Sequence, residues 1–314
     1  MIDHIGVDVG STTVKIVVLD ENFREKYSDY KRHKSKIRDT IHEMLDAYIK
    51  YVKANKNVDE NEWRCSVGIT GSGGIRFAEE LELGFIQEVV AETKAIKKEY
   101  PITDVVIELG GEDAKIIFLK NGIEQRMNGI CAGGTGAFID QMASLLNTDA
   151  KGLNEYAISA KHIYPIAARC GVFAKTDIQP LINDGVSRND IATSIFQAVV
   201  NQTISGLACG RKIEGHVAFL GGPLYFLSEL RNAFIKTLNL SEKEIIFPHN
   251  AHLYAATGAA IYFADESNGA LMLVKQFEDL VRNITMLFLK VIDWNQYLQA
   301  MKNMRSFVKG KKII

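Results

Sequence analysis

The hydrophobic and polar positions of this 314-residue chain form two patterns that alternate along its length. Short apolar runs that end at a glycine predict buried strands, and residues 5–10 (IGVDVG) and 65–71 (CSVGITG) are of this kind. Longer segments with apolar residues three and four positions apart predict amphipathic helices, and residues 35–54 are the clearest example. Further helices are expected at 74 onward, 88–99, 133–146, 171–183, 187–212 and 223–237. The alternation predicts an α/β fold.

One arrangement, a strand, a glycine turn and a second strand, occurs twice. It spans residues 5–20 and returns at 104–120. The repetition predicts two similar lobes with a nucleotide gripped between them, while two unrelated hairpins in one α/β domain are the alternative. We expect a first lobe at 1–100, completed by a helix at about 251–265, a second lobe at 101–250, and a C-terminal helical extension at 266–314.

Composition narrows the class of protein. Apolar residues make up 47% and charged residues 24%, which predicts a sizeable buried core. The net charge of −1 argues against nucleic acid or an acidic membrane bound by bulk electrostatics. No signal peptide and no apolar run of about 18 residues is apparent, so we expect a cytoplasmic protein without a membrane partner. The four cysteines are then expected to be reduced thiols.

The first glycine turn, residues 8–15 (DVGSTTVK), has the chemistry of a phosphate-binding loop. Asp8 ends a strand and can hold Mg²⁺, directly or through water. Glycine lets the backbone approach a phosphate closely, while hydroxyls, N–H groups and a lysine contact its oxygens. The candidate ATP-binding residues of this turn are Asp8, Gly10, Ser11, Thr12, Thr13 and Lys15.

The second turn, residues 108–113 (ELGGED), places glycines Gly110 and Gly111 between carboxylates. Carboxylates in a phosphate site require a cation, so Mg²⁺ is expected between Asp8 and Glu108. Residues 219–223 (FLGGP) lead from a strand to a helix and suit an adenine and ribose against bare backbone. They supply the candidate ligands Gly221, Gly222 and Pro223.

Together, the three motifs resemble the nucleotide-binding motifs of a known fold. DVGSTTVK, ELGGEDAK and AFLGGP, in this order, resemble the phosphate-1, phosphate-2 and adenosine motifs of the ribonuclease H-like fold shared by actin, Hsp70 and sugar kinases. Within it, residues 3–264 are most similar to the activator ATPases of 2-hydroxyacyl-CoA dehydratases and benzoyl-CoA reductases, the BadF/BadG/BcrA/BcrD family. NGICAGGTGAFIDQMA and ARCGVFAKTDI are the most specific parts. In these motifs the chain is most similar to the first domain of the long activases. It is therefore expected to be either a natural short protein or a fragment of a longer one.

Two cysteines precede predicted helix starts. Cys131 precedes GGTGAFIDQMASLL and Cys170 precedes GVFAKTDIQPLI, where a helix N-terminus favours a thiolate. An iron–sulfur cubane needs four thiolates, so two per chain suggest one [4Fe–4S] cluster on the axis of a homodimer. The resemblance implies the same two ligands; buried thiols or a reactive nucleophile are the alternatives. Cys65 and Cys209 are expected to be buried packing residues. The loop after Cys131 can also approach the nucleotide through Gly133, Gly134 and Thr135.

The resemblance implies an ATPase that drives one-electron transfer. Ferredoxin or flavodoxin would reduce the cluster, and ATP hydrolysis would drive the electron into a partner iron–sulfur dehydratase or reductase. In the activators the second motif is typically DIGGQD. This chain has Glu108 in place of the first Asp and Glu112 in place of the Gln. Glu112 is a candidate general base or a source of repulsion, and Asp113 is the other catalytic candidate. A small-molecule kinase and an ATP-switched scaffold are the alternative functions.

Overall fold

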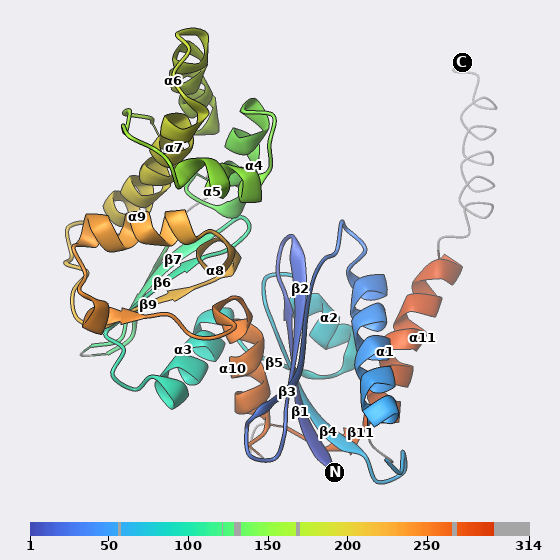
Figure 1. The fold of residues 1–314 in the computed structure, drawn as a ribbon. Coiled ribbons are helices and arrows are strands. Elements are labelled where there is room, and N and C mark those ends of the chain that lie inside the picture. The colour runs from blue at the N-terminus through green and yellow to red at the C-terminus, as the bar shows by residue number, and fades with distance from the viewer. Residues whose placement is uncertain (56–57, 121, 129–132, 168–169, 266–268, 292–314) are drawn as a thin grey trace, which may run out of the picture.

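The computed structural model describes residues 1–55, 58–120, 122–128, 133–167, 170–265 and 269–291, and side chains up to residue 283 (Figure 1). The first of its two mixed sheets is built on the N-terminal hairpin. β1 pairs antiparallel with β2 and parallel with β4. Across this sheet the strands are β11 (Met272–Leu273), β4 (Arg64–Thr70), β1 (Ile2–Val9), β2 (Thr13–Leu19) and β3 (Glu25–Arg32), with β5 (Gly84–Phe85) beside β4.

The second sheet repeats this plan. β6 pairs antiparallel with β7 and parallel with β9. Its order is β10 (Ile245–Ile246), β9 (Val217–Leu220), β6 (Val105–Leu109), β7 (Ala114–Phe118) and β8 (Glu124–Met127). In both sheets a hairpin is followed by a third antiparallel strand, and a parallel strand pairs with the first strand on its other side. The first sheet ends in the antiparallel β11 and the second in the parallel β10. The two sheets therefore share the repeated plan that the sequence pattern predicts.

Helices form three layers around the two sheets (Figure 1). Outside the first sheet lie α1 (Ile37–Asn55), α2 (Gly74–Leu81) and α11 (Val274–Val291). Between the sheets lie α3 (Glu88–Glu99) and α10 (Tyr254–Phe263), which share a core with strands of both sheets. On the outer side of the second sheet are α4 (Gly136–Leu145), α5 (Ala150–Ala157), α6 (Gly171–Asn183), α7 (Arg188–Thr203), α8 (Gly222–Phe226) and α9 (Ser228–Leu238).

The middle layer depends on close packing between α3 and α10. A Cβ added at Gly258 of α10 would lie 1.8 Å from the carbonyl oxygen of Ala91, so only glycine allows this approach. The packing fixes α3, whose first turn faces the space between the lobes. Its position matters for the site described below.

The structure corrects several expected elements. The helix predicted at 187–212 is α-helical only to Thr203 and continues as a π-helix over Ile204–Ala208. The helix predicted at 223–237 is two helices that meet at Leu227. The sequence analysis did not predict α5, β5 or β11.

The first part of the predicted C-terminal extension packs with the first lobe. β11 pairs with β4, joining Met272 to Cys65 across the ladder. Val274, Phe277 and Val281 of α11 are buried in the core that α1 and the first sheet form. Residues 292–314 lie outside the described residues.

Candidate nucleotide site

The two predicted glycine turns meet face to face between the lobes. A Cβ added at Gly111 would lie 2.5 Å from Oγ1 of Thr12, so the turns touch where glycine has no side chain. On either side of this contact the cleft opens into two compartments, of about 550 Å³ and about 140 Å³. Both are lined by Thr12, Thr13, Lys15, Gly110 and Gly111, so one ligand contacting both turns would extend into both compartments.

Most of the predicted ATP-binding residues line this cleft. The larger compartment adds Gly10, Ser11, Glu108, Glu112 and Asp113, and the smaller one adds Gly222 and Pro223. Gly221 lies behind the surface, because a Cβ there would lie 2.1 Å from the carbonyl oxygen of Leu109. Gly133, Gly134 and Thr135 line neither compartment. Gly134 instead faces Gln202 and Thr203 of the helix α7 region.

The same acid–lysine pair occurs in both hairpins. Asp8 is the ladder partner of Lys15, and Glu108 is the ladder partner of Lys115. Lys15 Nζ lies 2.6 Å from Asp8 Oδ2, and Lys115 Nζ lies 2.9 Å from Glu108 Oε2. Lys115 occupies the position in the second turn that Lys15 occupies in the first, and the sequence analysis did not single it out. The repeat of an acid followed by a lysine seven residues later could have revealed it.

Asp8 retains one oxygen for a cation. The residue is completely buried, and its Oδ1 has no hydrogen-bond partner, while Oδ2 is taken by Lys15. A buried carboxylate oxygen without a partner is costly unless a ligand satisfies it. This donor set therefore fits the Mg²⁺ that the fold family implies, with Asp8 on one side of the cleft and Glu108 on the other.

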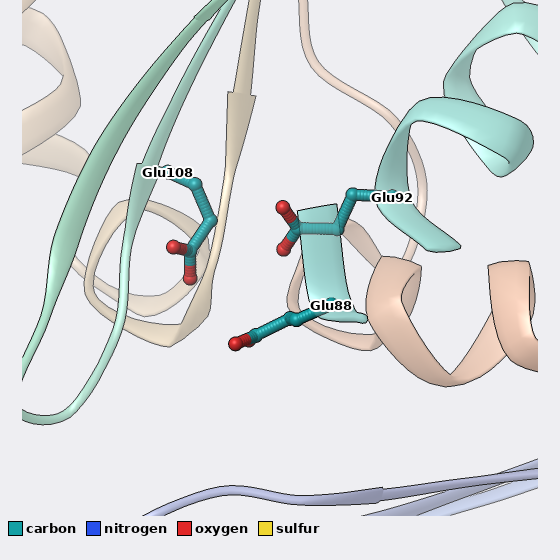
Figure 2. Close-up of side chains that lie close together, drawn as sticks. All are labelled: Glu88, Glu92 and Glu108. Atoms are coloured by element: carbon teal, nitrogen blue, oxygen red, sulfur yellow. The ribbon is translucent and has the colours of Figure 1, made fainter. Parts of the chain in front are cut away.

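A cluster of charges that the sequence analysis did not predict lies beside Glu108. Lys115 is 2% exposed, and its Nζ lies 2.9 Å from Asp113 Oδ2 and 3.1 Å from Glu88 Oε2. Glu88 and Glu92 lie one turn apart on α3 and point toward Glu108 (Figure 2). Only the packing of α3 between the lobes brings them here, and in sequence they resemble an ordinary charged helix face.

Burial shifts the titration of this cluster. It raises the pKa of Glu88 and of Glu92, the latter strongly, against the opposing charge of Lys115. Burial likewise raises the pKa of Glu108 to about 8, with Asp113 adding to the effect. Burial opposes the charge of Lys115, but Glu108, Glu92 and Glu88 outweigh it and raise its pKa. One ammonium cannot balance four carboxylates, so the lysine stays charged while the excess carboxylates favour protons or cations.

The two catalytic candidates differ in their surroundings. Asp113 pairs with Lys115, whereas Glu112 is exposed on the turn and lines the larger compartment. Glu112 is thus free to meet a water or a phosphate from the solvent side of the cleft. Glu88 also lines this compartment and approaches it from α3.

The smaller compartment has the surface expected for an adenine ring. Tyr30 and Phe226 line it, with ring centroids 5.6 Å apart, next to Gly222 and Pro223 at the start of α8. Arg32 of the first lobe and Asp140 of α4 close its rim through an ion pair of 3.1 Å. A flat aromatic base can lie between these side chains and the bare backbone.

The comparisons with known proteins agree with this geometry. The model of the BadF/BadG/BcrA/BcrD ATPase family matches residues 5–263. The chain belongs to this family. It is 26% identical over 274 residues to the 2-hydroxyisocaproyl-CoA dehydratase activator of Clostridioides difficile, covering 86% of this chain and 98% of the relative. The predicted family is confirmed, and the chain is identified as an ATPase.

Two solved activators of the family share the fold. Component A of the Acidaminococcus fermentans (R)-2-hydroxyglutaryl-CoA dehydratase superposes with a TM-score of 0.72 at 26% identity, over 83% of this chain and 97% of its own. The activator of the Clostridium difficile 2-hydroxyisocaproyl-CoA dehydratase, solved with ADPNP, gives 0.71 at 25% identity, over 84% and 95%. These matches confirm the predicted actin- and sugar-kinase-like fold and ATP binding.

Backbone hydrogen bonds connect the start of α4 to the second glycine turn of the nucleotide cleft. The N–H of Gly136 donates to the carbonyl of Gly110 at 3.0 Å, and the N–H of Ala137 donates to that of Gly111 at 2.7 Å. The first turn of α4 is therefore hydrogen-bonded to the second glycine turn. Cys131, a few residues earlier, lies outside the described residues.

The described cysteines differ in setting. Cys170 is the N-cap of α6 and is half-buried and free of any disulfide, as the helix-start prediction requires. Cys65 is buried in the first lobe as predicted, and burial raises the pKa of its thiol. Cys209 was expected to be buried and is instead exposed. It follows the π-helix and itself adopts a left-handed backbone conformation, with φ of 46°, which turns its thiol to the surface.

Among the described residues, every helix is too short or too polar to span a lipid bilayer.

Proposed function

We propose that this ATPase is a one-electron donor that uses ATP hydrolysis to reduce a partner iron–sulfur dehydratase or reductase. The observation that carries the proposal is the pair of hydrogen bonds between the glycine turn at Gly110 and Gly111 and the first turn of α4, in a chain whose relatives include dehydratase activators. The small-molecule kinase has less support, because these relatives are activators and not kinases.

The cleft residues would bind and orient MgATP. Gly10, Ser11 and Thr12 from one turn and Gly110 and Gly111 from the other would contact the phosphates, with Lys15 adding a charge. Asp8 and Glu108 would hold Mg²⁺, which neutralises phosphate charge when it is bound. Glu112, or Asp113 held by Lys115, would orient the attacking water.

Cys131 and Cys170 would hold a [4Fe–4S] cluster together with the same residues of a second copy of the chain. Cys170 fits this role because it is free, half-buried and placed at the N-terminus of a 13-residue helix, where the dipole stabilises a thiolate. The bound cluster supplies a carrier for a single electron. Ferredoxin or flavodoxin would be the electron source.

The fold offers a route by which the phosphate turn could influence the cluster. A displacement of Gly110 and Gly111 would pull on the N–H groups of Gly136 and Ala137, and so on α4. α4 contacts the start of α6, where a Cβ at Gly171 would lie 2.6 Å from Oε1 of Gln141. The two helices that follow Cys131 and Cys170 would therefore respond together.

The test uses cysteine variants of the full chain, purified without oxygen and loaded with iron and sulfide. Cys131→Ser and Cys170→Ser, made one at a time, should each lose the iron and the brown colour while keeping nucleotide affinity. Cys209→Ser is the matched control, because its thiol is exposed and belongs to no expected ligand set. Wild-type protein that stays free of iron after loading would refute the cluster.

A further inference from the structure

Three glutamates converge in the wall of the cleft, next to the predicted site of MgATP. Carboxylate oxygens of Glu88, Glu92 and Glu108 all lie within 4.8 Å of one another. Figure 2 shows Glu92 and Glu88 extending from α3 toward Glu108 on the opposite strand β6. Each element is fixed, α3 by its packing against α10 and β6 by its place inside the second sheet.

The charge around these glutamates is not balanced by the protein. Together with Asp113, the three glutamates contribute four carboxylates. Among the described residues, the ammonium of Lys115 contacts three of these, on Glu88, Glu108 and Asp113. The charge of Lys15 on the other lobe also acts on Glu88 and Glu92, but its ammonium is paired with Asp8, so it does not balance the four carboxylates. Buried charges in proteins are normally paired or coordinated to a metal, so a region that must also receive a triphosphate needs further positive charge.

Glu92 provides the second, independent observation. Glu92 is 3% exposed, and its side chain points toward Glu108 (Figure 2). Its Oε2 has no hydrogen-bond partner. Lys115 contacts Glu88 and Glu108 each through Oε2, which leaves the Oε1 atoms of both outside this contact. Three carboxylate oxygens on separate rigid positions are the donors that hard divalent cations prefer.

We propose that Glu88, Glu92 and Glu108 form a binding site for a divalent cation of the Mg²⁺ or Mn²⁺ class, apart from the metal that Asp8 would hold with ATP. Glu108 would be shared between the two positions. The site would neutralise the glutamates and link α3, the helix between the lobes, to β6 before a nucleotide enters. It does not depend on the proposed electron transfer, because neither nucleotide nor iron takes part in it.

Mn²⁺ binding to the full chain, nucleotide-free and stripped with a chelator, tests this site. Free Mn²⁺ is counted by its EPR signal, with Mg²⁺ as competitor, and the melting temperature is followed in parallel. We expect wild-type protein to bind Mn²⁺ and to melt higher with it. Glu92→Gln should weaken the affinity at least tenfold and remove the thermal shift. Glu79→Gln, the same change at an exposed position on α2, should leave both as they are.

Two results would overturn the site. The first is that wild-type protein binds no Mn²⁺ at millimolar concentration, which would mean that protons alone neutralise the glutamates. The second is an unchanged affinity in Glu92→Gln, and if Asp8→Asn then loses the affinity, the ion is assigned to Asp8. Glu88→Gln, at a partly exposed side chain, should show the same loss and serves if the Glu92 variant does not fold.

Discussion

Replacing Gly111 by alanine tests whether the two glycine turns must touch. The added methyl group would lie 2.5 Å from Thr12 Oγ1 and 3.3 Å from its Cγ2, whereas ordinary contacts begin at 3.4 Å. The turns must therefore separate by about 1 Å, unless the Thr12 side chain rotates away from Gly111. A misplacement of about 1 Å in a catalytic site can cost roughly 10²-fold in rate. We expect the turnover of ATP to fall about 10- to 100-fold, equal to about 1.4–2.7 kcal/mol of barrier.

The assay is steady-state phosphate release, with nucleotide affinity measured by calorimetry and folding checked by circular dichroism. Gly111→Ala should keep a melting temperature near that of wild type, because the methyl group meets Thr12 between the two turns and does not enter the hydrophobic core. The double variant Gly111→Ala/Thr12→Ala removes the clashing atoms, so the two losses should not add. Wild-type turnover in Gly111→Ala, or strictly additive losses, would refute the close approach of the turns.

Three further predictions address the catalytic turn, the charge cluster and the C-terminal segment. Glu112→Gln should preserve nucleotide affinity and change turnover, and equal turnover would remove Glu112 from the mechanism. In chelated buffer, the native pKa values of Glu92 and Glu108 lie above the unfolded value, so the native state binds more protons and stability should fall as pH rises from about 4.5 to 8. The melting temperature should fall less steeply in Glu92→Gln, and an identical slope would count against the buried charge. Phe277→Ala should lower the free energy of unfolding by about 3–5 kcal/mol in urea titrations, because Phe277 is fully buried in the first lobe; a loss below about 1 kcal/mol would mean that α11 is not part of that core.

The sequence predicted the parts of the site that a local pattern encodes. An acid and a glycine at the end of an apolar strand fix a turn by local chemistry, so the two glycine turns were predicted with the correct flanking strands. Cys170 was placed at a helix start for the same reason. The N-cap of α5, where the Asp149 side chain accepts from the N–H of Gly152, is a local signal that could have predicted that helix.

The rest depends on long-range packing. Glu88 and Glu92 lie on a helix whose sequence, EVVAETKAIKKE, is as charged as a solvent-facing one. Its packing against α10 and against strands of both sheets holds it at the cleft. The small residues around Cys209 suggested burial, but a π-helix and a left-handed turn expose its thiol. The Thr12–Gly111 contact joins residues about a hundred positions apart and leaves no trace in either turn alone.

The most direct test of the proposed function compares one reduced, cluster-loaded protein in three nucleotide states. The EPR spectrum and midpoint potential would be measured without oxygen in the nucleotide-free form, with ADP and with ATP. Because Gly110 and Gly111 are hydrogen-bonded to the first turn of α4, we expect the spectrum or the potential to change between ADP and ATP. Identical spectra and potentials in all three states would contradict the coupling of ATP to electron transfer.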